Sequence, residues 1–333
     1  MRVLILGGTV FLGRALVQAA KAQGHDVAIL SRGRSGPDPD GVEVFRGDRD
    51  QHDGLQGLDG QSFDVVVDTT SQDVGRVRRG VDALGRRTGH YVFTSTVSVY
   101  RSFAETGMTE EAPTFEPRWP GTSSPVAPAE EYGASNVACE RVVLDAMGDR
   151  GLVVRPGLIV GDHDPSDRFG YWPARMLREG PVLAPGGPGR PVQILDVRDL
   201  AEFVVGAAAA GAAGTYNAVG PAEPLTMGAL LRACQEHVGS AAELAWVEDD
   251  FLTGREVQPY LDLPLWIPDD PDDVGFSAVD ASRAVGAGLT YRPLPDTIEA
   301  ALRTERHRGL DRDRRAGLSP ERERELLEAW QAR

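Results

Sequence analysis

The sequence predicts an α/β protein built on a doubly wound parallel sheet, with a small C-terminal α/β lobe. Two observations predict this fold class. Short apolar runs alternate with helical patterns through the first two-thirds of the 333-residue chain, and the first run leads into a glycine-rich turn that opens a helix. Such βαβ alternation requires parallel strands with helices covering both faces of the sheet.

The predicted strands are short and continuously apolar, as expected for strands buried on both faces. They are Arg2–Leu6, Val27–Leu30, Val42–Phe45, Val65–Asp68, Tyr91–Thr94 and Leu152–Val154. The helices predicted between them are Phe11–Gln23, Gly75–Leu84 and Glu130–Met147. Residues 101–129 lack periodicity and are rich in Pro, Ser, Thr and Glu, so we expect a long loop there that is functional or mobile.

From about Gly157 the alternation weakens, and Pro-Gly loops separate shorter helices. These helices are predicted around Trp172–Arg178, at Val197–Ala209, from the N-cap Thr226 to His237, and from Ser319-Pro320-Glu321 onward. We therefore expect residues 1–156, with about 190–220, to form the sheet domain. The remainder of 157–333 is expected to form a smaller lobe and a C-terminal helix.

Composition argues against several classes of protein. The net charge of −15 is opposite to that of most nucleic-acid-binding domains. No apolar run approaches the ~18–20 residues that cross a bilayer, and the chain opens on a strand, so we expect no membrane partner and a cytoplasmic location. Cys139 and Cys234 have no CxxC spacing or histidine cluster beside them, so no metal site is expected.

The first strand runs into the loop Gly7-Gly8-Thr9-Val10-Phe11-Leu12-Gly13, which opens the first helix. The first amide groups of a helix have no partners inside it, and the helix dipole favours an anion at this end. Glycines let the backbone approach a phosphate closely. The strand–loop–helix context therefore predicts a phosphate-binding loop.

This loop resembles that of the extended and atypical short-chain dehydrogenase/reductases, the epimerase/dehydratase superfamily, whose usual pattern is GxxGxxG. Val10 stands in place of the central glycine, as in the subset that carries GGT-x-F-x-G. Because a β-branched residue does not easily take a positive φ, we expect an ordinary conformation at Val10. The resemblance covers roughly residues 1–300 and implies a Rossmann domain that binds a nicotinamide dinucleotide. It places loop contacts to this cofactor at Gly7, Thr9, Phe11, Leu12 and Gly13.

The end of the second strand, Leu30-Ser31-Arg32-Gly33-Arg34, bears on the choice of dinucleotide. NAD-selective members have an acidic residue there, whereas Arg32 and Arg34 suit the 2′-phosphate of NADP(H). NADP(H) is therefore favoured over NAD(H), although arginines that are solvated or stacked on adenine would permit either. The resemblance places further cofactor contacts at Asp48, Arg49, Thr69, Thr70, Thr94, Pro156 and Leu158.

Two further motifs resemble the catalytic signatures of the superfamily. The segment 93–100 matches the strand-five signature and implies that Thr96 hydrogen-bonds a substrate oxygen. Tyr132-Gly133-Ala134-Ser135-Asn136 resembles the YxxxK motif, in which the tyrosine transfers a proton and the lysine holds the nicotinamide ribose. Here Asn136 occupies the lysine position, from which it could still hydrogen-bond the ribose.

The missing lysine changes what the tyrosine can do. Lys21 is the only lysine in the chain and falls late in the first predicted helix, far from Tyr132 in the family fold. A phenol without a neighbouring ammonium stays protonated at neutral pH, so it is a proton donor more than a base. Carbonyl reduction is then less impaired than alcohol oxidation. On this hypothesis Asn136→Lys should raise tyrosine-dependent oxidation.

Candidate substrate contacts follow from the same resemblance. They are Ser98, Tyr171, Trp172, Gln193 and Trp266. The aromatic members suggest an aromatic or partly apolar substrate, although each is as compatible with an ordinary core position. His163 lies between two aspartates, but a solvated loop explains this better than a metal site.

We interpret the chain as an atypical reductase that uses NADP(H) to reduce a carbonyl-type small molecule. By analogy alone, we place this reaction in specialised metabolism. The protein is expected to be a monomer or a homodimer. Three alternatives remain open. One is a redox-neutral epimerase, dehydratase or cyclase, and another is a catalytically spent protein that only binds the cofactor. The third is RNA binding, as in chloroplast stem-loop-binding relatives, against which the charge of −15 argues.

Overall fold

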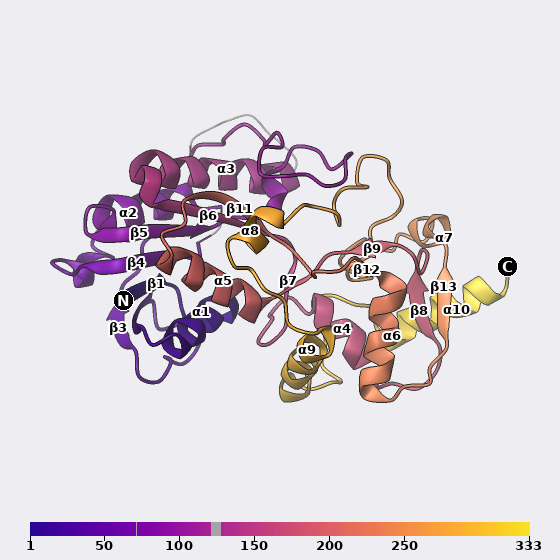
Figure 1. Ribbon diagram of the computed structural model, residues 1–333. Coiled ribbons are helices and arrows are strands. Elements are labelled where there is room, and N and C mark those ends of the chain that lie inside the picture. The colour runs from indigo at the N-terminus through magenta and orange to yellow at the C-terminus, as the bar shows by residue number, and fades with distance from the viewer. Residues whose placement is uncertain (71, 121–127) are drawn as a thin grey trace.

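A seven-stranded parallel sheet forms the larger of two lobes, which lie side by side in Figure 1. The computed structural model describes residues 1–70, 72–120 and 128–333. The strand order is β11-β6-β5-β4-β1-β2-β3. The strands are β1 Arg2–Leu6, β2 Asp26–Ser31, β3 Glu43–Arg46, β4 Phe63–Asp68, β5 Thr88–Thr94, β6 Gly151–Pro156 and β11 Gly214–Ala218. The chain starts in the middle of the sheet and winds outward in both directions, so the predicted fold class is confirmed.

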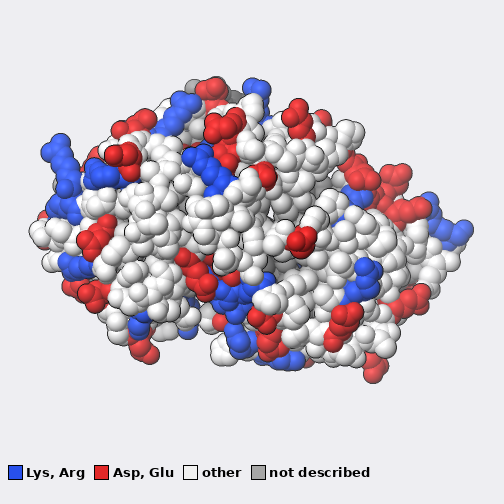
Figure 2. Space-filling view, in the orientation of Figure 1, with Lys and Arg blue, Asp and Glu red and all other residues white. Residues whose placement is uncertain are grey.

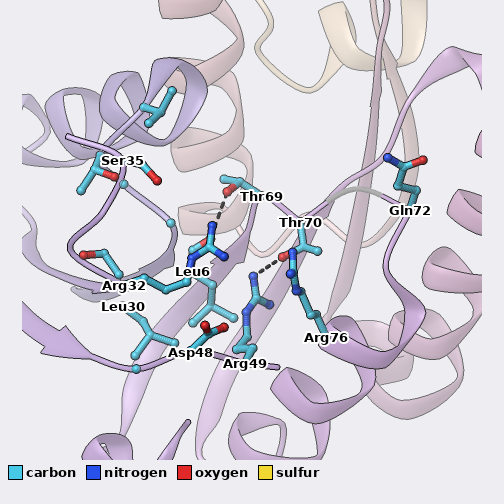
Figure 3. Close-up of a pocket in the computed structure, with 16 residues that line it drawn as sticks. Leu6, Leu30, Arg32, Ser35, Asp48, Arg49, Thr69, Thr70, Gln72 and Arg76 are labelled. Atoms are coloured by element: carbon cyan, nitrogen blue, oxygen red, sulfur yellow. Dashed lines mark hydrogen bonds between the residues drawn. The ribbon is translucent and has the colours of Figure 1, made fainter. Parts of the chain in front are cut away.

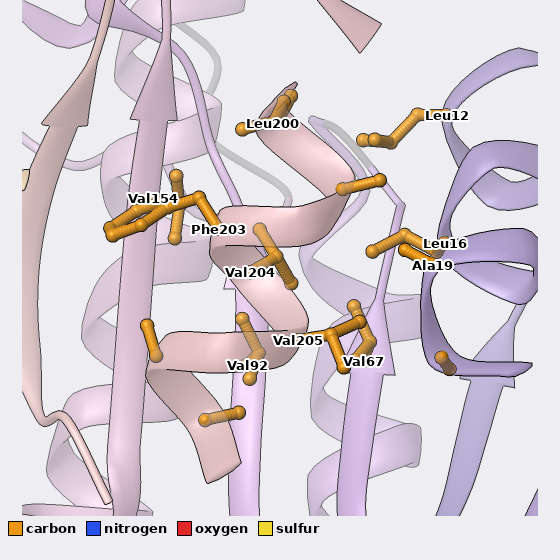
Figure 4. Packing of buried hydrophobic residues seen from close by; sticks show 14 of the residues in the cluster. Leu12, Leu16, Ala19, Val67, Val92, Val154, Leu200, Phe203, Val204 and Val205 are labelled. Atoms are coloured by element: carbon orange, nitrogen blue, oxygen red, sulfur yellow. The ribbon is translucent and has the colours of Figure 1, made fainter. Parts of the chain in front are cut away.

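Helices cover both faces of this sheet. They are α1 Phe11–Ala22 and α5 Val197–Ala209 on one face, and α2 Val74–Leu84 and α3 Pro128–Met147 on the other. Strand β1 shows why: Val3 and Ile5 pack under α1 and α5, whereas Leu4 and Leu6 pack under α2 and α3. Because alternate residues of a strand face opposite ways, an apolar run at every position predicts this two-sided burial. Figure 4 shows α5 packed between the strands and α1.

The smaller lobe has its own hydrophobic core and three two-stranded ladders. Its strands are β7 Ile159–Val160, β8 Val182–Pro185, β9 Pro191–Val192, β10 Leu195–Asp196, β12 Leu225–Thr226 and β13 Leu244–Val247. The helices after β6 other than α5 are α4 Arg168–Arg175, α6 Met227–Val238, α7 Asp249–Thr253, α8 Ser282–Gly286, α9 Leu294–Arg308 and α10 Pro320–Gln331. Short 3₁₀ helices lie at η1 Gln56–Leu58, η2 Val97–Val99 and η3 Gly148–Arg150.

Helix starts predicted from capping residues are confirmed. The Thr226 hydroxyl accepts from the Ala229 amide, and the Ser319 hydroxyl accepts from the Arg322 amide, with Pro320 in the first turn. The helix expected around Trp172–Arg178 runs earlier, from Arg168 to Arg175. Within the described ranges, no helix is long and apolar enough to cross a membrane.

The long loop predicted after β5 is present over residues 101–120, and its remainder falls partly on 121–127, outside the described residues. Backbone hydrogen bonds tie it to a segment near the end of the chain. Gly275 N–H donates to the Phe103 carbonyl at 2.7 Å, and Gly107 N–H donates to the Ala278 carbonyl at 2.6 Å. The Phe103 and Phe276 rings pack edge to face at 5.0 Å. The loop is therefore joined to the C-terminal part of the chain.

Candidate functional site

A cavity of about 440 Å³ opens where β1, β2, β3 and β4 end (Figure 3). It is lined by the glycine loop, the turn after β2, the segment after β3 and the segment after β4. In open parallel sheets, ligands bind at this edge, where neighbouring connections turn to opposite faces. The structure brings the predicted loop residues Gly7 and Thr9 together here with Arg32, Asp48 and Arg49.

The glycines of the loop are required by its shape. Gly7 and Gly8 have φ values of +129° and +104°, which residues with side chains rarely adopt. A Cβ on Gly13 would lie 2.5 Å from the Gly8 nitrogen, so only glycine lets α1 begin this close to the loop. Val10 has φ −133°, which confirms the expected ordinary conformation. Phe11 carries the positive φ instead, at +39°.

The start of α1 can hold an anion. Its N-cap is Val10, whose side chain cannot satisfy the first amide groups, and no acidic residue lies in the first turn. Unpaired amides and the helix dipole therefore face the cavity. Together with the backbone approach allowed by Gly7 and Gly8, this arrangement fits the pyrophosphate of a dinucleotide.

Three arginines line the cavity in the described part of the chain, and two of them are paired with carboxylates. Arg49 lies 2.8 Å from Asp68, and Arg76 lies 2.7 Å from Asp50 through its Nε. Arg32 makes no hydrogen bond or ion pair with a described residue. Hydrogen bonding from Arg76 lowers the pKa of Asp50, with a smaller electrostatic contribution from Arg32.

The predicted cofactor residue Arg34 is exposed and does not line the cavity. The neighbouring guanidinium of Arg46 is held by Ser31, at 2.6 Å, and by Asp38. Among the predicted pair, Arg32 therefore reaches the cavity and Arg34 does not. Figure 3 shows Arg32 extending from the end of β2 toward the glycine loop.

The end of β4 is fixed by a buried carboxylate. Asp68 accepts hydrogen bonds from Arg49, from the Tyr91 hydroxyl at 2.9 Å and from the Thr70 amide at 2.9 Å. Arg49 also donates to the Thr70 hydroxyl. Beside it, the Thr69 hydroxyl donates to the Leu6 carbonyl at 3.0 Å. Arg49, Thr69 and Thr70 thus line the cavity and also hold its floor together.

Two of the three predicted catalytic residues, Thr96 and Tyr132, come from elements in direct contact. Thr96 is buried at the start of η2, where its hydroxyl accepts from the Ser98 amide at 3.1 Å. A Cβ on Gly133 would lie 2.3 Å from the Ser98 carbonyl oxygen, so glycine at this position brings α3 against η2. Tyr132, half-buried, precedes it on the helix. Lys21 donates to the Asp40 carbonyl on the outer side of α1, so its ammonium is engaged away from Tyr132.

Asn136 is fully buried, and its amide is used within the protein. Its Oδ1 accepts from the Gln72 amide at 3.1 Å, and its Nδ2 donates to the Tyr132 carbonyl at 2.9 Å. Asn136 does not line the cavity, whereas Gln72 does. The expectation that Asn136 hydrogen-bonds a ribose is therefore not supported, because both ends of the amide have protein partners.

A buried polar network behind the site was not predicted. Glu140 accepts from the Ser95 hydroxyl at 2.6 Å and forms two hydrogen bonds with Arg155, at 2.9 and 2.7 Å. Arg155 also contacts the Tyr100 hydroxyl, which donates to Asn217. The partners of Glu140 lie on other elements, so no spacing within α3 reports this network.

The aromatic residues predicted to line a substrate pocket lie elsewhere. Tyr171, Trp172 and Trp266 are at most 2% exposed and fill the core of the smaller lobe. The indole of Trp172 donates to the Pro264 carbonyl at 2.9 Å, and that of Trp266 donates to Asp249 at 2.8 Å. Buried tryptophans whose indole N–H groups are satisfied by the protein are typical of a core, and this is where the structure places both of them, together with Tyr171.

Other predicted contacts lie outside the cavity that holds the glycine loop. The Gln193 amide is paired with the backbone of Val279, at 2.9 and 3.1 Å. Thr94 and Pro156 are buried at the ends of β5 and β6, and Leu158 packs against the core of the smaller lobe. Leu12 packs in the core under α1. No cluster of His, Cys, Asp or Glu in the described ranges could hold a metal ion.

A model of the NAD dependent epimerase/dehydratase family matches residues 3–219, which include the glycine loop, the whole parallel sheet and the segments that carry Thr96 and Tyr132. The chain belongs to this family. Its members are enzymes, and the match confirms the superfamily that the motifs indicated.

Curated relatives of this family member are distant. The 2′-dehydrokanamycin reductase of Streptomyces kanamyceticus is 27% identical over 294 residues, which cover 84% of this chain and 74% of the relative. A chloroplast stem-loop binding protein of 41 kDa from Arabidopsis thaliana is 29% identical over 114 residues, 30% of each chain. Among solved structures, the Bordetella bronchiseptica enzyme WbmH in complex with NAD+ superposes with a TM-score of 0.65 at 18% identity, covering 92% of this chain and 98% of that one.

Proposed function

We propose that this family member is an NADP(H)-dependent oxidoreductase that reduces a carbonyl-type small molecule. The observation that carries the cofactor assignment is Arg32, which lines the cavity without a carboxylate partner in the described part of the chain. In a protein with a net charge of −15, the charged residues that line this cavity are Arg32, Arg49, Arg76 and Asp48, a balance of three positive charges to one negative.

A 2′-phosphate would use the unpaired arginine. Arg49 and Arg76 already have carboxylate partners, so their charge is largely compensated. Arg32 has a planar guanidinium whose donors suit a phosphate. It also stands at the end of β2, where an acidic residue would favour NAD(H) instead.

The direction of the reaction follows from the residues around Tyr132. The described structure places the ammonium of Lys21 on another face of the protein, and the Asn136 amide is neutral and engaged. A bound dinucleotide would supply the hydride chemistry. Tyr132 is then suited to donate a proton to a carbonyl oxygen, and Thr96 to hydrogen-bond that oxygen. The relative from S. kanamyceticus, which is named as a reductase, supports this direction and the analogy with specialised metabolism.

Direct binding and turnover test the proposal. Calorimetric titration of the purified protein should give tighter binding of NADPH than of NADH. With a panel of ketones and dehydro-sugars, nicotinamide absorbance should fall with at least one compound. Equal or tighter binding of NADH would overturn the cofactor assignment, and failure of the whole panel despite NADPH binding would count against the reductase.

A redox-neutral epimerase or dehydratase is the second candidate, because the family includes such enzymes and the lysine of the tyrosine motif is absent. It predicts product formation with no net change in nicotinamide absorbance.

RNA binding is less well supported, because the stem-loop-binding relative matches only 30% of this chain and the charge is −15. On the face shown in Figure 2, acidic and basic groups are interspersed over both lobes.

A further inference from the structure

We propose that Asn136 is a positioning residue: it ties the wall of the dinucleotide cavity to helix α3 and so sets dinucleotide affinity without touching the dinucleotide. This inference rests on the proposed function only in taking the cavity beside the glycine loop as the dinucleotide site. It assigns Asn136 a role different from that of a ribose ligand.

The geometry is a bridge made by one side chain. Its Oδ1 accepts the Gln72 amide hydrogen at 3.1 Å, and its Nδ2 reaches the Tyr132 carbonyl at 2.9 Å. Gln72 lines the cavity, at the opposite end from Arg32 in Figure 3. Asn136 itself is 0% exposed and lies behind that wall. A single amide therefore joins the backbone of the cavity wall to the backbone of Tyr132.

The wall needs this support because of its conformation. Gln72 has a φ of +53°, in the left-handed region that is unfavourable for a residue with a side chain. Upstream, Thr70 is held by Asp68 and Arg49. The hydrogen bond that the Gln72 amide donates to Asn136 Oδ1 holds the next described residue of the wall. Without it, the Gln72 amide would lose its acceptor at a partly buried position of an exposed residue, at a cost of about 1 kcal/mol.

A lysine cannot make this bridge. Its ammonium has donors but no acceptor for the Gln72 amide, and a charge at a fully buried position is costly unless it is paired. The sequence alone suggested that Asn136→Lys should raise oxidation. The structure predicts instead that this variant loosens the cavity wall and weakens dinucleotide binding.

The first test measures binding of NADPH and NADH by calorimetry, without any substrate. Asn136→Ala should lower the affinity for NADPH and for NADH by about tenfold each, since both dinucleotides would contact the same cavity wall. Asn217→Ala is the matched control: Asn217 is also 0% exposed, but its amide bonds to Tyr100 and to the Asp280 carbonyl, outside the cavity. This control should lower the melting temperature and leave both affinities near those of the wild type.

A conservative variant supplies a readout that a general loss of stability would not move. In Asn136→Asp, a protonated carboxyl can donate to the Tyr132 carbonyl and accept from Gln72, as the amide does. Burial beside a carbonyl raises the pKa of such a carboxyl, so this form persists to a higher pH than usual. Relative to the wild type at the same pH, the affinity of Asn136→Asp should approach normal near about pH 5.5 and fall toward that of Asn136→Ala near about pH 8.

The outcomes separate the two proposals. If the wild type binds neither dinucleotide, the proposed function fails. If the wild type binds NADPH and Asn136→Ala binds it equally well, the function stands and the inference fails. Tighter binding by Asn136→Lys would overturn the inference as well, because it would show that position 136 acts directly on the cofactor.

Discussion

The guanidinium of Arg49 lies 2.8 Å from the carboxylate of Asp68, which is completely buried at the end of β4. The same arginine lines the cavity beside the glycine loop and reaches the Thr70 hydroxyl. A charged pair at this position performs two tasks. It satisfies a carboxylate inside the sheet, and it sets the floor on which a ligand rests.

Removing one partner of this pair should be costly. Arg49→Met leaves the Asp68 carboxylate buried without its cation, and we expect a loss of about 3–5 kcal/mol in the free energy of unfolding. The matched control is Arg306→Met, because Arg306 pairs with Glu299 at 3.9 Å on the surface, with 52% and 47% of the side chains exposed. This variant should lose less than about 1 kcal/mol. Urea denaturation measures both, and similar losses would refute the argument.

Two helical glycines should respond oppositely to the same substitution. In Gly13→Ala the new methyl would lie 2.5 Å from the Gly8 nitrogen, so α1 must move away from the loop. For Gly13→Ala we therefore expect a lower free energy of unfolding and loss of NADPH binding. Gly206, inside α5, has open space around the Cβ position, so Gly206→Ala should gain about 0.5–1 kcal/mol. Thermal unfolding and calorimetry check both, and normal NADPH binding by Gly13→Ala would contradict the assigned loop geometry.

Arg32→Ala separates the two dinucleotides. Loss of one charge-assisted contact to a phosphate should lower the affinity for NADPH by about tenfold or more and leave the affinity for NADH nearly unchanged. The effect should shrink as salt is added, because the cavity is open to solvent. Arg34→Ala is the control, since Arg34 is exposed outside the cavity lining. Equal losses of NADPH and NADH in Arg32→Ala would mean that this arginine contacts a part common to both.

Asp164→Asn should stabilise the protein at neutral pH. Burial raises the pKa of Asp164, whose Oδ2 has no hydrogen-bond partner among the described residues, while its Oδ1 accepts from the Ser166 amide at 2.8 Å. A folded-state pKa above the unfolded value means that the charged form opposes folding. The gain from asparagine, on the order of 1 kcal/mol near pH 7, should therefore shrink as the pH falls toward 4 and Asp164 takes up its proton. Unfolding curves across this range would show a constant difference if the carboxyl were solvated.

Much of the larger lobe could be predicted because its signals are local. Strand β1 and helix α5 have the bounds expected from the sequence. A continuous apolar run marks β1, and in α5 the apolar residues recur with helical spacing. Strand β11 was missed because Thr215 and Asn217 interrupt its apolar pattern. Helix α9 was missed because its charged last turn resembles a solvated run, although Leu294, Ile298 and Leu302 follow a helical spacing.

Some features of the candidate site could likewise be predicted from local sequence, and others could not. The glycine loop and Arg32 follow a strand end directly, so their positions depend on nearby residues alone. The partners of Asn136 and Arg49 lie on other elements, and no spacing within one motif reports them. The burial of Trp172 and Trp266 also depends on tertiary packing, because an aromatic residue near a predicted pocket and one in a core have the same sequence pattern.

The pairing of residues 103–107 with residues 275–278 has a consequence for synthesis on the ribosome. The loop after β5 emerges from the ribosome long before residues 275–278, its hydrogen-bond partners, are made. Until then, the amide of Gly107 and the carbonyl of Phe103 have only water to bind. Closing such a distant contact is slow compared with forming local helices. A nascent chain released before residue 275 could complete its sheet but could not form the hydrogen bonds between residues 103–107 and residues 275–278. Proteolysis of such fragments should therefore begin at residues 103–107.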